Sequence, residues 1–146
     1  QRASDDRWYA FNDCHAIMAF IGAARLDDAR TCLASLTRAA DQDDDNALVA
    51  RSVGLPVAAA LIAFAERRYD EAAEALIAIR GTAARFGGSH AQRDILSLTA
   101  LHAAKRGKMT SAAEALVAER RFHKPASPWV ARLADDKMEG RVLAMS

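Results

Sequence analysis

One short pattern occurs three times in this chain, at a nearly constant interval. In each copy a large apolar residue precedes two polar residues and an alanine, and a leucine follows four positions later. The copies are Leu26 to Leu33, Tyr69 to Leu76 and Met109 to Leu116. Their alanines, Ala29, Ala72 and Ala112, are separated by 43 and 40 residues. An interval of this size is typical of stacked helical hairpins, in which each hairpin buries its apolar face against the next one.

The spacing resembles that of the tetratricopeptide repeat. In that arrangement an alanine on the second helix lets the first helix approach closely, and the later leucine fills the space beside it. The residues expected to face these alanines on the first helices are Ile17, Ala60 and Ala100. The interval exceeds the usual length of about 34 residues, so longer helices or loops must absorb the difference.

The composition agrees with closely packed helices, because 35 of the 146 residues are alanine, the best helix former. We therefore predict an all-α fold: a right-handed stack of helical hairpins, or tetratricopeptide-like α-solenoid, with about seven helices. Residues 1–146 are expected to form one domain. Its repeats are predicted at about 5–40, 47–86 and 89–123, and a half-polar capping helix is predicted at 128–143.

Charge and cysteine content limit the partners and the compartment. Lysine and arginine number 20 against 19 acidic residues, without the basic excess of a nucleic-acid module. The longest apolar run, Leu55 to Ala65, is 11 residues long, too short to span a membrane. We expect Cys14 and Cys32 to be apolar fillers in a reducing cytoplasm rather than a disulfide. The chain starts at Gln1, so we expect it to be a piece of a longer protein.

Local signals predict where several helices begin, bend or end. The run Gly54 to Pro56 should kink or restart the first helix of the second repeat. Gly107 should end the helix that precedes it. Ser111 and Glu114 have the spacing of a capping box at the start of the next helix. The acidic run Asp41 to Asn46 lacks the glycine and glutamate of an EF-hand, so we predict a solvated loop instead of a calcium site.

Two further stretches are more specific than the repeat pattern. Phe11 to Phe20 and Gly87 to Asp94, together with Val53 to Pro56, resemble the C-terminal part of proteins similar to tetratricopeptide repeat protein 38. The resemblance covers most of the chain and implies that the parent protein has further helical repeats on the N-terminal side. It implies no catalytic activity or substrate.

A cluster of polar residues is the best candidate for a functional site. Its members come from the first helix and from the start of the fifth: Asn12, Asp13, His15, His90, Gln92, Arg93 and Asp94. In a right-handed stack the first helices of the hairpins line the concave face, so both groups are expected at one groove, with Leu61 and Phe64 deeper in it. The alternative is structural: Asp94 favours a helix N-terminus, and Arg93 pairs with Asp13 or Asp94 to fix adjacent repeats.

These observations favour a non-catalytic scaffold for protein–protein or intramolecular interaction. The expected partner is a protein, a peptide or the N-terminal repeats of the parent protein, and weak homo-oligomers are also compatible with the sequence. No cofactor, metal, nucleic acid or membrane is expected, because no histidine pair has the spacing of a helical metal site. The alternative is part of an enzyme or small-molecule-binding protein, with a polar site around His15 and His90. A closed pocket enclosing both histidines would favour that alternative.

Overall fold

The computed structural model describes residues 8–42, 45–85, 90–125 and 128. Within these ranges the chain is helical and contains no β-strand, which confirms the predicted all-α class. The elements are α1 (Trp8–Gly22), α2 (Leu26–Ala40), α3 (Asp45–Val49), η2 (Ala50–Gly54), α4 (Leu55–Ala65), α5 (Tyr69–Arg85), α6 (His90–Arg106) and α7 (Thr110–His123). Because α3, η2 and α4 form one continuous helix, the described ranges hold six helices rather than about seven. The predicted capping helix at 128–143 lies outside the described residues, apart from Pro128.

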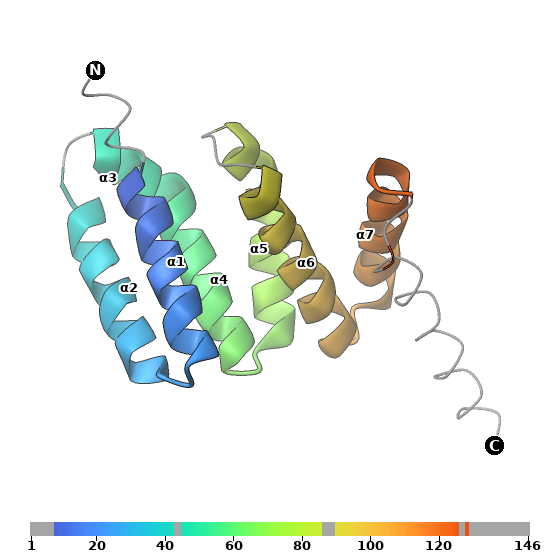
Figure 1. Ribbon diagram of the computed structural model, residues 1–146, viewed down its shortest axis with the longest axis horizontal. Helices are drawn as coiled ribbons and strands as arrows, with labels where there is room; N and C mark the ends of the chain where they lie inside the picture. Colours follow the sequence, from blue (N-terminus) through green and yellow to red (C-terminus); the bar gives the residue numbers. More distant parts are fainter. Residues whose placement is uncertain (1–7, 43–44, 86–89, 126–127, 129–146) are drawn as a thin grey trace.

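The helices form three antiparallel hairpins that lie side by side (Figure 1). The hairpins are α1 with α2, the continuous α3–η2–α4 helix with α5, and α6 with α7, and their three turns lie at the lower edge of the view. Both helices of the first hairpin pack against α4, and the most extensive packing among the described helices joins α5 to α6. Each hairpin therefore buries its apolar surface against the next one.

The three hairpin turns share one backbone conformation. Ala24, Arg67 and Lys108 adopt left-handed φ angles of 56°, 64° and 58°. The N–H of the residue after each of them donates to a carbonyl five residues back, in the pairs Arg25–Phe20, Arg68–Ala63 and Met109–Ala104. This is the Schellman motif, which satisfies carbonyls that the end of a helix leaves without a partner.

The shared turn geometry corrects the predicted register of the third repeat by one residue. The alanines five positions after the left-handed residues are Ala29, Ala72 and Ala113, and all of them are buried. The predicted Ala112 is only half-buried. Glycine usually takes the left-handed position, but here Lys108 takes it. Gly107 instead allows a close approach of α6 to α5, because a Cβ there would lie 3.0 Å from the backbone nitrogen of Asp70.

The turn between α6 and α7 leaves no place for the predicted capping box. The residue that completes the Schellman motif, Met109, is also the N-cap of α7, and it makes no side-chain cap hydrogen bond. Ser111 consequently lies inside α7 instead of capping it. Arg25 likewise completes the Schellman motif after α1 and is the N-cap of α2, without a side-chain cap hydrogen bond.

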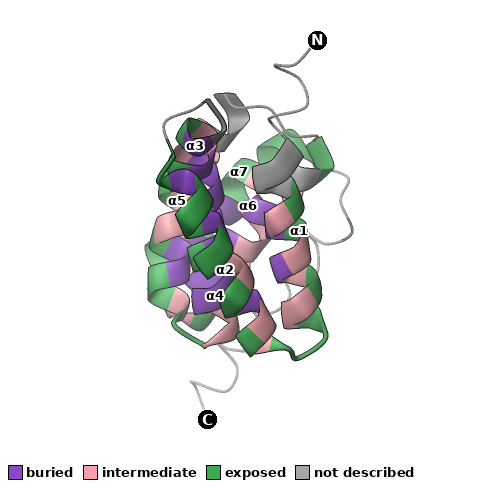
Figure 2. Ribbon diagram, turned by 90° about the vertical axis from the view of Figure 1, so that its left-hand side faces the viewer, coloured by how far each residue is buried: buried purple, intermediate pink, exposed green. Residues whose placement is uncertain are grey.

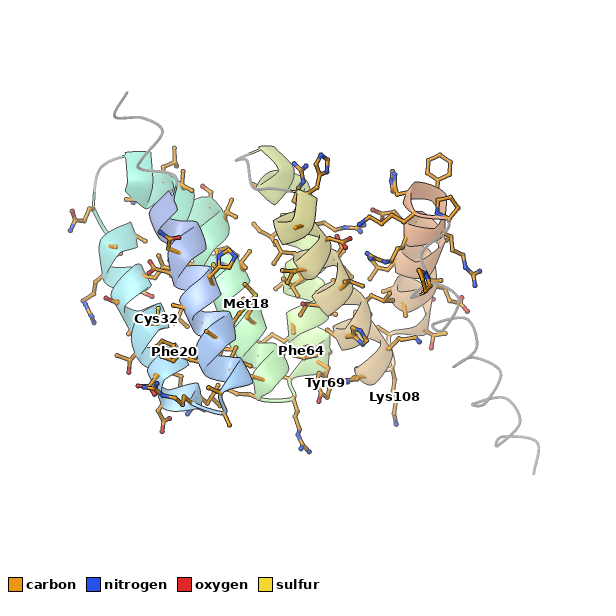
Figure 3. The ribbon with its side chains drawn as sticks, in the orientation of Figure 1. Met18, Phe20, Cys32, Phe64, Tyr69 and Lys108 are labelled. Carbon is orange, nitrogen blue, oxygen red and sulfur yellow. The ribbon has the colours of Figure 1, made fainter. Side chains whose placement is uncertain are left out.

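A glycine at one of these turns should stabilise the domain. We expect Lys108→Gly to raise the free energy of unfolding by about 0.5–1 kcal/mol, because glycine adopts a positive φ without the steric cost of a Cβ. The exposed lysine side chain contributes little packing that could be lost (Figure 3). Urea unfolding monitored by circular dichroism measures the change. Lys108→Ala keeps the Cβ and should match the wild type; an equal gain in both variants would rule out backbone strain as the cause.

The predicted kink at Gly54 to Pro56 is instead a π-helical turn. In η2 the N–H of Leu55 donates to the carbonyl of Ala50, five residues earlier. Pro56 has no N–H, and its ring collides with the carbonyl one turn earlier in a regular α-helix, so the wider turn accommodates it without breaking the helix. The turn also directs Arg51, whose guanidinium donates to carbonyls at the end of α2, including that of Ala40.

The core consists of small and medium apolar side chains between the helices. The residues predicted to face the alanines, Ile17, Ala60 and Ala100, have exposed fractions of 0–2%, which confirms their inward direction. In Figure 2 the buried residues lie between the helices, and the exposed residues lie on the outer surface. No polar or charged side chain in the described part of the chain is buried. The close helix packing therefore depends on alanine.

One helix has the length and composition of a membrane span, contrary to the expectation from the sequence. The continuous helix Ala47–Ala65 has 19 residues and a mean hydropathy of 1.9, because the α-helical and π-helical parts join. However, 56% of this window is buried inside the protein, as in the core helix of a soluble domain. Length and composition alone are therefore weak evidence for a membrane.

Candidate functional site

An apolar hollow opens between the first helices of the three hairpins. Its volume is about 30 Å³, enough for one or two water molecules. The residues that define its walls come from α1, from the helix containing η2 and from α6: Cys14, His15, Met18, Val53, Leu61 and Ile95. In Figure 3 Met18 lies on the side of α1 toward α4. The predicted groove residue Leu61 therefore lines this hollow, and it is buried.

The predicted polar cluster is divided between different surroundings. His15 is exposed at the edge of the hollow, and Asn12 is exposed one turn earlier on α1. His90 does not line the hollow; its Nδ1 lies 3.1 Å from Nη2 of Arg93 at the start of α6. The apolar hollow is therefore lined by His15 and not by His90, and it is not a site shared by the two histidines.

Asp94 fixes α6 to α7 and does not contribute to the hollow. Arg120 donates to both carboxylate oxygens, at 2.8 and 3.2 Å, and Nζ of Lys124 lies 3.0 Å from one of them. The Arg120 hydrogen bonds, with a smaller effect of Lys124, hold the pKa of Asp94 below its usual range. The partners of Asp94 are therefore Arg120 of α7 and Lys124, which follows α7, whereas Arg93 contacts His90 instead of Asp94.

On α1, Cys14 is buried and the neighbouring Asp13 is half-buried. The thiol of Cys14 donates to the carbonyl of Gly54 at 3.7 Å, and the thiol of Cys32 donates to the backbone carbonyl of Asp13 at 3.8 Å. Both cysteines are free. Burial, with a smaller effect of the Asp13 charge, raises the pKa of Cys14 to about 12. A thiol with so high a pKa is protonated at neutral pH, so Cys14 lacks the character of a nucleophile.

Phe64 belongs to an aromatic contact that joins three helices. Its ring meets that of Tyr69 edge to face, with centroids 5.5 Å apart, where α4 turns into α5 (Figure 3). The guanidinium of Arg106, in the last turn of α6, lies 5.3 Å from the Phe64 centroid and 5.6 Å from the Tyr69 centroid. Phe64 is thus placed by packing and by cation–π contact, and it does not line the hollow with Leu61.

An ion-pair network between the first two hairpins was missed in the sequence. Oε1 of Glu66 accepts from Nε and Nη2 of Arg30, at 3.0 and 2.6 Å. Oε2 accepts from Nε and Nη2 of Arg68, at 3.1 and 2.6 Å, and Arg68 also pairs with Glu71. The hydrogen bonds from Arg68 and Arg30 lower the pKa of Glu66. The sequence indicates this network only through acidic residues near the turns, and their positions do not reveal which arginines they pair with.

No protein-family model matches this chain, and no solved structure matches its fold. Within the described ranges no group of three or more histidine, cysteine or acidic side chains is placed to hold a metal ion. The function is therefore argued from the surfaces of the protein itself.

Acid should weaken the ion pairs of Asp94 and Glu66. Both carboxyls have a lower pKa in the folded chain than in the unfolded chain, so the pairs stabilise the fold above the unfolded value. This contribution is lost as the pH falls through the folded values. We expect the melting temperature to change little from pH 7 to about 5 and to drop below about pH 4.

Circular dichroism melts between pH 7 and 3 measure this dependence. Asp94→Asn should remove part of the drop in acid, because the titrating group is gone. Glu74→Gln, at an exposed position of α5, should keep the wild-type profile. A melting temperature that rises below pH 5 would contradict the assignment.

Proposed function

We propose that this domain is a tetratricopeptide-like, right-handed stack of helical hairpins that serves as a non-catalytic interaction scaffold. A protein or peptide partner, or the N-terminal repeats of a longer parent protein, docks on the concave face formed by α1, α4 and α6. The proposal includes the resemblance to the C-terminal repeats of proteins similar to tetratricopeptide repeat protein 38, and a cytoplasmic location.

The apolar hollow between the first helices carries this proposal. Ile95, on the α6 wall, has an exposed fraction of 40%. A partner that places one apolar side chain over the mouth of the hollow would also cover Ile95, and such buried anchors supply most of the energy of an interface. The exposed His15 at the edge offers a polar contact beside the anchor.

Two further observations support the proposal. The three hairpin turns have the same conformation, as expected if the hairpins are repeats of one unit. Both cysteines are free, in agreement with a reducing compartment.

The test compares Ile95→Asp with Leu48→Asp. Leu48 has an exposed fraction of 50% on α3 but does not line the hollow, so it is a matched control. Proteins captured by the immobilised chain from a cell extract are identified by mass spectrometry, and each is then titrated directly. A partner on the concave face should bind Leu48→Asp like the wild type and Ile95→Asp at least about tenfold more weakly. Equal binding by all three proteins would overturn the proposal, provided that thermal melts show both variants folded.

A further inference from the structure

We propose that the surface between α5, α6 and α7 holds a separate site for a small organic anion. Two adjoining hollows, of about 400 and about 90 Å³, share Arg80, Ser97 and Glu119 in their walls. Arg93 reaches the larger hollow, and Arg120 reaches the smaller one. The larger hollow shares only Leu96 with the walls of the apolar hollow, and none of its charged residues lines that hollow, so the site stands independently of the proposed scaffold function.

Positive charge exceeds negative charge in these walls. Four cationic side chains, Arg80, Arg93, Arg120 and Lys124, face two carboxylates, those of Asp94 and Glu119. Asp94 is already bound by Arg120 and Lys124, and Glu119 lies 2.8 Å from Arg80. Arg93 has no carboxylate partner in the described part of the chain, and its guanidinium contacts the imidazole of His90. An anion entering the larger hollow therefore meets an arginine whose charge is not compensated.

Arg120 offers a second point of attachment. Its side chain has an exposed fraction of only 12%, and its two terminal nitrogens are both occupied by Asp94. The Nε atom is buried and has no hydrogen-bond partner. Buried donors in proteins are nearly always satisfied, so an acceptor belongs at this atom. An oxyanion in the smaller hollow, which Arg120 and Lys124 both line, also meets an excess of positive charge, because these two cations share one carboxylate, that of Asp94.

The walls also indicate the chemical class of the ligand. Guanidinium groups bind carboxylates and phosphates through paired hydrogen bonds. Apart from Ser97, the uncharged part of the larger hollow's wall is apolar, with Ile77 and Leu96, and Gly81 leaves open space beside the helix. The site therefore fits an oxyanion, either phosphate or carboxylate, attached to a short apolar group.

The test is a titration with phenyl phosphate, with inorganic phosphate alongside it, at constant ionic strength. Side-chain N–H signals of the arginines in ¹H–¹⁵N spectra report the binding site. We expect saturable shifts at Arg80, Arg93 and Arg120, and Arg93→Gln should weaken phenyl phosphate binding at least about tenfold. Arg121→Gln, at an exposed arginine of α7, should leave the affinity unchanged.

A second variant makes the test specific for the hollow. Gly81→Leu places a side chain in the larger hollow, and should weaken phenyl phosphate binding more than phosphate binding. Absence of saturable shifts with both probes would overturn the proposal. Equal weakening by Arg93→Gln and Arg121→Gln would also overturn it. Binding would then depend on the net charge of the protein and not on the arginine that lines this hollow.

Discussion

Ala72→Leu is expected to lower the free energy of unfolding by at least about 2 kcal/mol, because it overpacks a close helix crossing. Ala72 has an exposed fraction of 0%, and α5, which carries it, packs against both α4 and α6. A leucine there adds three carbon atoms where no space is available. Urea denaturation of the purified chain measures the loss.

The control for this substitution lies on the same helix. Ala78 is exposed, so Ala78→Leu adds the same atoms without overpacking and should change stability by less than about 0.5 kcal/mol. If Ala72→Leu also unfolds like the wild type, the alanines do not mark the closest approach of the helices, and the repeat register is wrong.

Asp94→Asn is expected to cost about 2 kcal/mol, because it leaves the nearly buried Arg120 without its counter-charge. The asparagine keeps the size of the side chain, so a loss of packing is not the cause. Glu119→Gln removes a carboxylate with an exposed fraction of 46% that pairs with Arg80, and should cost less than about 1 kcal/mol. Equal costs in the two variants would contradict the special position of Asp94 between α6 and α7.

The helices were predictable from the sequence because their signals are local. The spacing of Ala29 and Ala72 and the turns beside them are enough to place two hairpins. The register of the third repeat was less predictable, because Gly107 and Lys108 are neighbouring candidates for the left-handed residue of the turn. Local rules favour glycine at the left-handed position, whereas the approach of α6 to Asp70 requires glycine one residue earlier.

The candidate site was less predictable than the fold, because it depends on how helices pair. His15 and His90 were placed together on the assumption that both face one groove. The rotation of α6 about its axis decides otherwise: Ile95 faces the hollow, and Asp94 faces α7. Arg120, the partner of Asp94, lies 26 residues away, so neighbouring residues do not reveal it. Such rotations come from the packing of whole helices and leave no local pattern.

The π turn at Ala50–Gly54 also changes the angular phase of the helix that contains it. A π turn holds about one residue more than an α turn, so residues on its two sides differ in direction by about 100° from an uninterrupted helix. Ala47 and Val57 lie on opposite sides of the π turn, and both are buried. A single α-helical periodicity does not extend from one to the other. Deleting one residue there would rotate α3 relative to α4, turning Arg51 away from the end of α2, and would bring the Pro56 ring against the carbonyl one turn earlier. The insertion therefore sets the register between the first two hairpins.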